Sequence, residues 1–411
     1  MGNREILGRI IIILLSIFVV MSGYGVLLPV LPYYTERLAL KSGIVAEEDI
    51  NYHIGILTSI YPFFQLLFAF IWGKLSDRFG RKMLITMGLS GFVIMQVLTG
   101  LSTSLFMLYV ARILGGIFSS SVIPVGNAFL SDLTNSMQRR KVLAWSGVAV
   151  STGVITGPMI GGYLAQTNLH LDTRMGHLLL DRFSIPFLAV ALLGTIILLL
   201  AFGWLKNPKA QSLNIIEAGQ KPESNVKRDF VLLLFLSLIL QLAVTLFETV
   251  FSVYAKDILL FDTSQVGLGF MLCGLVMAVL QPLFANVDAK TISVNTQLFI
   301  GFALAAFAMI VFSFWTYNIY VYTMIVIFAI GGAMVTPNLI TMISLVDKNY
   351  TGANLSLQTS VNSIGQVLGP MLGIWLYTIG SSWPYPVIGT VLSLVAVLII
   401  PNLRFKSQKM T

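Results

Sequence analysis

Twelve long runs of apolar residues follow one another along the chain, with short polar segments between them. Each run is long enough to cross the hydrocarbon core of a membrane, about 30 Å thick, as a single helix. The pattern therefore predicts an all-α membrane protein with twelve transmembrane helices. The runs lie at residues 10–33, 53–73, 83–101, 106–130, 142–165, 183–204, 230–254, 265–286, 292–314, 318–345, 353–378 and 385–402.

One segment of the fifth run returns in the eleventh run, about half the chain length later. Residues 153–164 read GVITGPMIGGYL and residues 365–376 read GQVLGPMLGIWL, with identical residues at six of the twelve positions. An internal repeat of this kind is typical of membrane proteins built from two homologous halves. We therefore expect two six-helix bundles, residues 1–204 and 230–411, joined by a polar cytoplasmic linker at residues 205–229.

The repeated segment contains a stripe of glycines. Gly153, Gly157 and Gly161 recur at every fourth position, so on a helix they form one face without side chains. In lipid, such a face allows a second helix to approach closely. Pro158 removes a backbone donor and bends the helix beside the stripe. The pattern predicts a close contact between two helices at this stripe.

Composition and charge fit a membrane protein with cytoplasmic termini. Of the residues of this chain, 56% are hydrophobic and 10% are charged. In a soluble domain, about a quarter of the residues are charged. Nineteen Lys and Arg residues fall in loops and tails on one side of the predicted spans, and five fall on the other. This bias places both termini in the cytoplasm, so the net charge of +8 faces anionic lipid rather than nucleic acid. The lone Cys273 excludes an intramolecular disulfide.

Two charged residues lie within predicted spans. Glu248 is the one carboxylate well inside a span, and burial disfavours its charged form, which makes it a candidate proton carrier. The alternative is a glutamate near the outer surface, since Lys256 and Asp257 follow closely. Arg112 lies within the fourth span and marks a polar interior by default. The alternative is an arginine whose side chain reaches the lipid headgroups.

Several polar and aromatic residues within the spans are candidates to line a substrate cavity. The amides among them could instead only connect helices by hydrogen bonds, and the sequence leaves both interpretations open. The candidates are Tyr24, Gln65, Asn127, Phe247, Phe251, Asn338, Gln358 and Asn362.

A charged loop is predicted after the second run, where residues 73–82 read GKLSDRFGRK. Its two glycines permit a tight reversal. The loop resembles, nearly position for position, the loop between spans two and three of the major facilitator superfamily. The resemblance implies that Arg81 pairs with Asp132 and that Asp77 meets the inner end of the eleventh span, so that the cluster latches the inner side shut. The latch residues are Gly73, Asp77, Arg78, Gly80, Arg81 and Asp132.

The glycine stripe resembles the antiporter motif of this superfamily, which is associated with exchange of drugs for protons. The matching residues are Gly153, Gly157, Pro158, Gly161 and Gly162. The segment around Arg112 resembles the span-four motif whose arginine is implicated in proton transfer. Residues 247–254 resemble the span-seven segment of Gram-positive quinolone and multidrug pumps, where the matching glutamate couples to protons. This chain departs from those pumps at Ala333, where they carry a second acid, and in its long outer loop at residues 166–182.

The sequence and the resemblance together predict a proton-coupled exporter of hydrophobic or amphipathic drugs that works by alternating access as a monomer in the cell membrane. Its expected partners are a small substrate, protons and the bilayer, and neither a metal nor a cofactor is expected. The second interpretation is an exporter or flippase of a lipid, glycolipid or sugar conjugate on the same fold. An intramembrane enzyme would need paired aspartates, a Ser–His pair or a zinc cluster within the spans. This chain has one carboxylate well inside a span, and of its three histidines only His53 lies near a span end, so an enzyme is not expected.

Overall fold

The computed structural model describes residues 3–134, 136–166, 173–175, 178–180, 182–206, 224–285, 292–346 and 351–399. The first half of the chain contains α1 (Asn3–Lys41), α2 (Glu47–Phe79), α3 (Arg81–Gly100), α4 (Leu105–Ser119), α5 (Val122–Leu133), α6 (Ser136–Leu164) and α7 (Ser184–Trp204). The second half contains α8 (Ser224–Asp257), α9 (Thr263–Ala285), α10 (Val294–Val311), α11 (Asn318–Leu345), α12 (Thr351–Ile379), α13 (Pro384–Leu394) and the π-helical turn η2 (Val395–Ile399).

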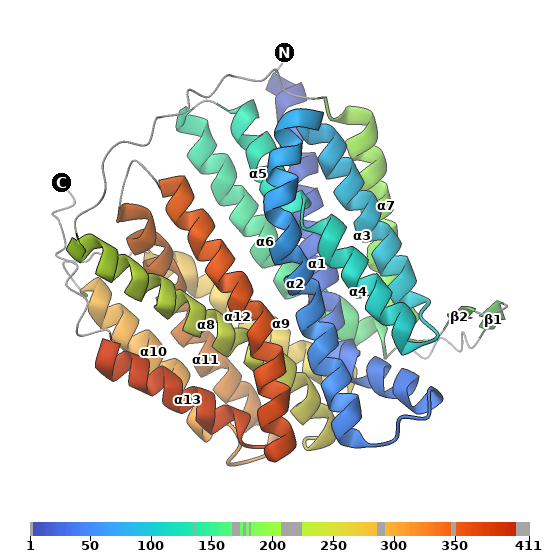
Figure 1. Cartoon of the computed structure of the whole chain (residues 1–411), viewed down its shortest axis with the longest axis vertical. Coiled ribbons are helices and arrows are strands. Elements are labelled where there is room, and N and C mark those ends of the chain that lie inside the picture. The colour runs from blue at the N-terminus through green and yellow to red at the C-terminus, as the bar shows by residue number, and fades with distance from the viewer. Residues whose placement is uncertain are drawn as a thin grey trace. The chain divides into compact units, whose positions relative to one another are not determined.

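Each predicted apolar run is helical along most of its length, and only the fourth run is divided between two α-helices, so the predicted all-α architecture is confirmed (Figure 1). Nine of the described helical segments are long and apolar enough to cross a membrane. Of the others, α2 and α12 are 33 and 29 residues long, and the apolar segment Pro384–Leu398 is shorter. Long apolar helices suit a bilayer because each satisfies its own backbone hydrogen bonds.

The fourth span is interrupted, which the sequence did not predict. Helix α4 ends at Ser119 and α5 begins at Val122. The Ser120 hydroxyl donates to the carbonyl of Ile117 at 2.7 Å, and the Ser121 hydroxyl donates to that of Phe118 at 2.9 Å. Serine side chains compete in this way with backbone hydrogen bonds, so the serine pair accounts for the break.

We predicted a charged loop at residues 73–82. This prediction is wrong for most of the segment, because α2 continues through Gly73 to Phe79. Only Gly80 forms the reversal, with a φ of 89° that side-chain-bearing residues rarely adopt. Its backbone N–H caps α2 by donating to the carbonyl of Ser76. The polar residues of this segment have ordinary helix propensity, so α2 ends only where glycine changes the backbone direction.

The predicted outer loop at residues 166–182 contains a short antiparallel ribbon of β1 (Thr173–Met175) and β2 (Leu178–Leu180). Thr173 pairs with Leu180 and Met175 with Leu178. The ribbon projects away from the neighbouring helices of the first half (Figure 1).

The chain divides into two compact units. Unit 1 comprises Met1–Leu213 and Phe251–Met271, and unit 2 comprises Asn214–Val250 and Leu272–Thr411. The end of α8 and the start of α9 therefore group with the first half of the chain. The division into residues 1–204 and 230–411, with a linker at residues 205–229, therefore stays a prediction.

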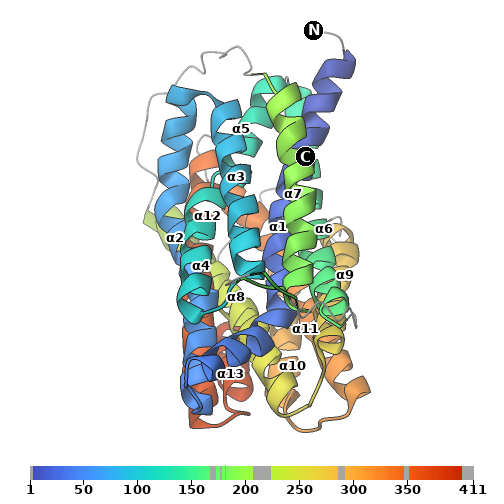
Figure 2. The same ribbon diagram turned by 90° about the vertical axis from the view of Figure 1, so that its right-hand side faces the viewer.

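Within unit 1, α1 lies along α6 and also contacts α5 and α7. Helix α3 lies between α4 and α7, and Figure 2 shows α3 and α7 side by side. Within unit 2, α10 packs against α11 and α13. The core of unit 2 is aromatic, with Phe312 stacked on Tyr385 at 4.4 Å between ring centroids.

Candidate functional site

The glycine stripe of α6 is the surface on which α6 meets α1. A Cβ atom at Gly153 would lie 2.6 Å from the carbonyl oxygen of Phe18, and one at Gly157 would lie 2.5 Å from that of Ser22. A Cβ at Gly161 would meet the backbone of Val26. The predicted close helix contact is therefore confirmed, and its partner is the backbone of α1.

The remaining glycine of the motif, Gly162, faces a different helix. A Cβ on Gly162 would lie 3.1 Å from the Cα of Gly267 in the first turns of α9. The Thr263 hydroxyl donates to the carbonyl of Gly162 at 3.1 Å. Helix α6 thus packs without side chains against α1 on one face and against the start of α9 on another.

The second copy of the repeat packs in the same way within unit 2. Cβ atoms at Gly365 and Gly369 would lie 3.0 Å from the backbone nitrogen of Leu242 and 2.9 Å from its carbonyl oxygen, respectively. The Thr245 hydroxyl donates to the carbonyl of Gly365 at 3.0 Å. Because α12 lies on α8 as α6 lies on α1, the repeat seen in the sequence is also a repeat in the structure.

A set of polar contacts joins the end of α8 to α1, and sequence reasoning missed it. The Ser252 hydroxyl donates to the carbonyl of Leu28 at 2.9 Å. The ammonium of Lys256 pairs with Glu36 at 3.2 Å and with Asp257 at 2.8 Å. No sequence signal relates Glu36 to Lys256, because the two residues are far apart along the chain.

Asp262 caps α9 in a capping box. Its carboxylate accepts hydrogen bonds from the backbone nitrogens of Ser264 and Gln265, both at 2.9 Å. The Gln265 side chain in turn accepts from the backbone nitrogen of Asp262 at 3.0 Å. Burial works against the charge of the carboxylate, but the hydrogen bonds from Gln265 and Ser264 outweigh it and hold the pKa of Asp262 below its ordinary value of 3.8. The spacing Asp-x-x-Gln was a signal that could have identified this cap.

Arg112 is buried, with 2% of its surface exposed. Its Nε atom donates to the carbonyl of Leu57 in α2 at 2.9 Å, and its guanidinium lies 4.6 Å from the ring centroid of Tyr61. The part of the chain that the structure describes gives no hydrogen-bond partner to its Nη2 atom. The interior placement is therefore the correct alternative, and Arg112 lies in unit 1.

Glu248 lies in unit 2, inside the apolar segment of α8, more than two turns before the helix ends at Asp257. Its side chain is half-buried, and it lies near Cys273 of α9 in the same unit. The neighbouring Phe247 is 1% exposed and packs against Phe328 at 5.0 Å between ring centroids. Phe247 therefore belongs to the core of unit 2 rather than to a cavity wall.

A polar cavity of about 290 Å³ lies within unit 2 between α8, α11 and α12. Two of the predicted cavity residues, Gln358 and Asn362, line it. The Ser237 hydroxyl donates to Asn362 at 2.8 Å and accepts from the Gln358 amide at 3.0 Å. Both interpretations of these amides hold at once, because they line the cavity and also connect α12 to α8.

The other predicted cavity residues lie elsewhere. Asn127 of α5 accepts a hydrogen bond from Ser146 of α6 at 2.6 Å. Asn338 of α11 donates to Gln297 of α10 at 3.0 Å, so both amides connect helices. In unit 1, Tyr24 and Gln65 are half-buried on α1 and α2, Tyr24 lies 6.1 Å from Tyr61 between ring centroids, and Phe251 is buried beside Phe270.

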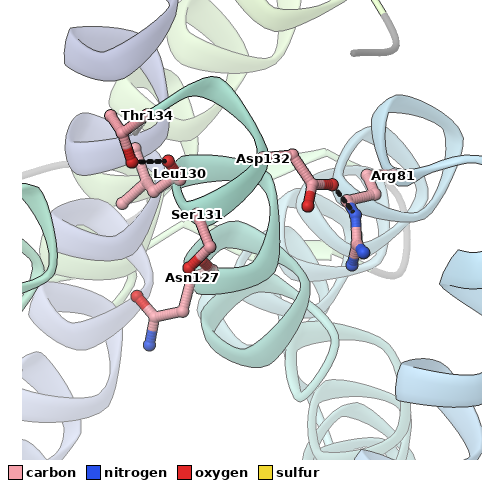
Figure 3. A network of polar contacts seen from close by, with 6 residues as sticks. All are labelled: Arg81, Asn127, Leu130, Ser131, Asp132 and Thr134. Carbon is pink, nitrogen blue, oxygen red and sulfur yellow. Dashed lines mark hydrogen bonds and ion pairs between the residues drawn. The ribbon is translucent and has the colours of Figure 1, made fainter. Parts of the chain in front are cut away.

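The structure contains the ion pair between Arg81 of α3 and Asp132 of α5 that the resemblance implied (Figure 3). The side chains are 18% and 16% exposed. Asn127, on the same helix, points away from the pair (Figure 3). The guanidinium of Arg78 lies 5.6 Å from the ring centroid of Phe79, and the side chain of Asp77 lies outside the described residues. The role of these residues as a latch stays a prediction.

Three curated relatives share a quarter or so of their residues with this chain. Tetracycline resistance protein, class B, of Escherichia coli is 28% identical over 362 residues, covering 86% of this chain and 85% of that protein. Multidrug resistance protein 1 of Bacillus subtilis is 28% identical over 380 residues, covering 91% of each. Quinolone resistance protein NorA of Staphylococcus aureus is 24% identical over 411 residues, covering 98% of this chain and 99% of that protein.

Solved structures show the same fold at low sequence identity. A D-xylose–proton symporter superposes with a TM-score of 0.77 at 15% identity, covering 98% of this chain and 99% of that one. A bacterial homologue of the human lysosomal transporter Spinster gives a TM-score of 0.76 at 15% identity, covering 96% of each chain. The sequence profile of the Major Facilitator Superfamily matches residues 13–364 and 233–409. The chain is therefore a multi-pass membrane protein that belongs to the Major Facilitator Superfamily.

Proposed function

We propose that this protein exports hydrophobic or amphipathic drugs in exchange for protons by alternating access, with both termini in the cytoplasm. The observation that carries the proposal is Glu248, a half-buried carboxylate within the apolar part of α8. A carboxylate in such a place is costly and is kept for a function. The relatives are tetracycline, multidrug and quinolone resistance proteins, and their names support drugs as the cargo.

Glu248 carries the proton in this mechanism. It takes up a proton from outside, substrate leaves, and reopening toward the cytoplasm releases the proton. The membrane potential contributes about 2.3 kcal/mol per charge for each 100 mV. Arg112 acts in unit 1. Its buried guanidinium, which contacts the carbonyl of Leu57 and the ring of Tyr61, provides a fixed positive charge along the proposed proton path.

Alternating access requires some helix contacts to be permanent and others to break. The α6–α1 contact is made of backbone against backbone over the whole glycine stripe, so we assign it to the permanent set. The contact of Ser252 with Leu28 is a single hydrogen bond of 2.9 Å. The contact of α6 with the start of α9 is short, because it consists of the 3.1 Å hydrogen bond from Thr263 and the close approach of Gly162 to Gly267. We assign them, with the Lys256–Glu36 pair, to the set that breaks and reforms in each cycle. The Arg81–Asp132 pair lies elsewhere, between the first residue of α3 and the last turn of α5, and we assign it to the latch on the cytoplasmic side.

A second candidate is export of a lipid, glycolipid or sugar conjugate. The observation in its favour is the cavity of unit 2, whose described lining is uncharged and rich in amides and hydroxyls, including Gln241, Thr336 and Thr359. Such a lining pairs with hydroxyl-bearing groups by hydrogen bonds, and it offers no counter-charge to a cation.

The test uses purified protein in liposomes with a pH gradient and a trapped pH dye. Ethidium, a fluoroquinolone, tetracycline and a labelled glycolipid are each supplied to wild type and to Glu248→Gln. The matched control is Glu47→Gln, which makes the same change on an exposed carboxylate in the first turn of α2. Drug-dependent proton flux that is lost only in Glu248→Gln supports the proposal, and equal flux in that variant contradicts it. Movement of the glycolipid without any drug response favours the second candidate.

A further inference from the structure

A second cavity of the described chain, about 410 Å³, lies in unit 1 where α1 begins and α7 ends. Its lining includes the cationic side chains of Arg4, Arg9 and Lys206, one carboxylate, Glu5, and the indole of Trp204. The cavity is therefore cationic. None of these residues takes part in the drug and proton sites described above.

The cationic groups suit a phosphate. Arginine offers a planar fork of N–H donors that matches phosphate oxygens, and a lysine adds a mobile point charge. Arg9 is only 4% exposed, which holds its side chain in place, while Arg4 and Lys206 are exposed at the rim. Arg9 can therefore contact an anion from the interior of the cavity, while Arg4 and Lys206 contact it from the rim.

The position of the cavity identifies the kind of phosphate. Phe202 and Trp204, at the end of the apolar helix α7, expose 71% and 67% of their surfaces. Exposed aromatic residues at the end of a transmembrane helix lie at the depth of the lipid headgroups. Lys82 of α3 donates to the carbonyl of Phe202 at 2.7 Å, which adds a further positive charge beside this end. A phosphate at this depth belongs to a phospholipid.

Two glycines leave the cavity open. Gly8 and Gly203 both line it, and a Cβ atom on either one would meet nothing within 4 Å. Neither adopts a positive φ, so the backbone does not require glycine at these positions. A glycine inside a helix lowers stability relative to alanine, and here the missing side chains leave room for a headgroup.

We propose that this cavity binds the phosphate headgroup of an anionic phospholipid. Basic pockets between transmembrane helices are a recognised form of such sites. The inference does not depend on the identity of the exported substrate or on the role of Glu248.

The test measures the unfolding temperature of the purified full-length protein in detergent, with dioleoylphosphatidylglycerol or dioleoylphosphatidylcholine added. One variant, Arg4→Gln with Lys206→Gln, removes two exposed charges. A second, Gly203→Leu, fills the cavity and leaves every charge in place. The matched control is Arg228→Gln, which removes an exposed charge at the start of α8, outside the cavity.

We expect phosphatidylglycerol to raise the unfolding temperature of wild type and of Arg228→Gln, and the increase to be lost in both cavity variants. Inorganic phosphate at the same phosphate concentration is expected to have no such effect. An increase of equal size in the cavity variants, or with phosphatidylcholine, overturns the proposal. An equal effect of inorganic phosphate also overturns it, because the site would then bind a free anion rather than a lipid.

Discussion

The contact between α1 and α6 predicts a large effect from adding a single methyl group at Gly157. In Gly157→Ala, the new Cβ would lie 2.5 Å from the carbonyl oxygen of Ser22 and 2.8 Å from the Cα of Gly25. Both neighbours are backbone atoms, so no side chain can turn aside. Restoring an ordinary contact of about 3.5 Å requires the helices to separate locally by roughly 1 Å.

A gap of that size forfeits about a quarter to a half of the dispersion attraction between the facing atoms. Overpacking of this kind costs about 1–3 kcal/mol. The matched control is Gly147→Ala in the same helix, where a Cβ would meet nothing within 4 Å. There the change is expected to stabilise the helix by about 0.5–1 kcal/mol. The two variants should therefore move the unfolding temperature in opposite directions.

The assay is thermal unfolding of purified protein in one detergent, followed by the fluorescence of its six tryptophans. Gly369→Ala in α12 provides a second test, because its Cβ would lie 2.9 Å from the carbonyl oxygen of Leu242. Equal unfolding temperatures for Gly157→Ala and Gly147→Ala would refute the reasoning, since the first could not then be limited by backbone contact.

Two further predictions concern charged groups of unit 1. Asp132→Ala leaves the guanidinium of Arg81 partly buried without its counter-charge, and we expect a loss of about 1–3 kcal/mol of stability. A double-mutant cycle with Arg81→Gln measures the coupling, and strictly additive effects would show that the pair contributes nothing. Asp262→Ala removes the cap of α9 and is expected to cost about 0.5–2 kcal/mol at neutral pH. Because the native pKa of Asp262 is held below 3.8, its contribution is complete above about pH 4 and is lost as the pH falls through the lower native value. Unfolding temperatures of wild type and variant should therefore converge in acid, and parallel curves would contradict this account.

The helices and the glycine contact could be predicted because each depends on local pattern. Apolar runs of sufficient length define helices in lipid without reference to the rest of the chain. The spacing of Gly153, Gly157 and Gly161 defines a face that can be approached, but it does not name the helix that approaches. That α1 occupies this face, and that Gly162 faces α9 instead, depends on tertiary packing.

The remaining features depend on contacts between distant segments. The depth of Arg112 could not be decided from the sequence, since it is set by the carbonyl of Leu57 and the ring of Tyr61 on another helix. The pairing of Glu36 with Lys256 joins two segments that are far apart in the sequence, one in the first helix and the other near the middle of the chain. Phe247 was predicted as a cavity residue, but aromatic residues in a span are equally suited to a core.

The serine pair between α4 and α5 has a consequence for how the fourth span enters the membrane. The Ser120 and Ser121 hydroxyls bond to the carbonyls of Ile117 and Phe118, only three residues earlier. The two hydroxyls lower the cost of interrupting a helix in lipid, because they satisfy two of the carbonyls that the break would otherwise leave without donors. Neighbouring helices add to this: the Trp72 indole of α2 also donates to the carbonyl of Ile117 at 2.6 Å, and the Ser121 hydroxyl also donates to the carbonyl of Leu84 in α3 at 3.2 Å. Insertion of the segment Leu105–Leu133 is therefore less costly than an interrupted span without serines would be, and packing against α2 and α3 completes the hydrogen bonding of the break.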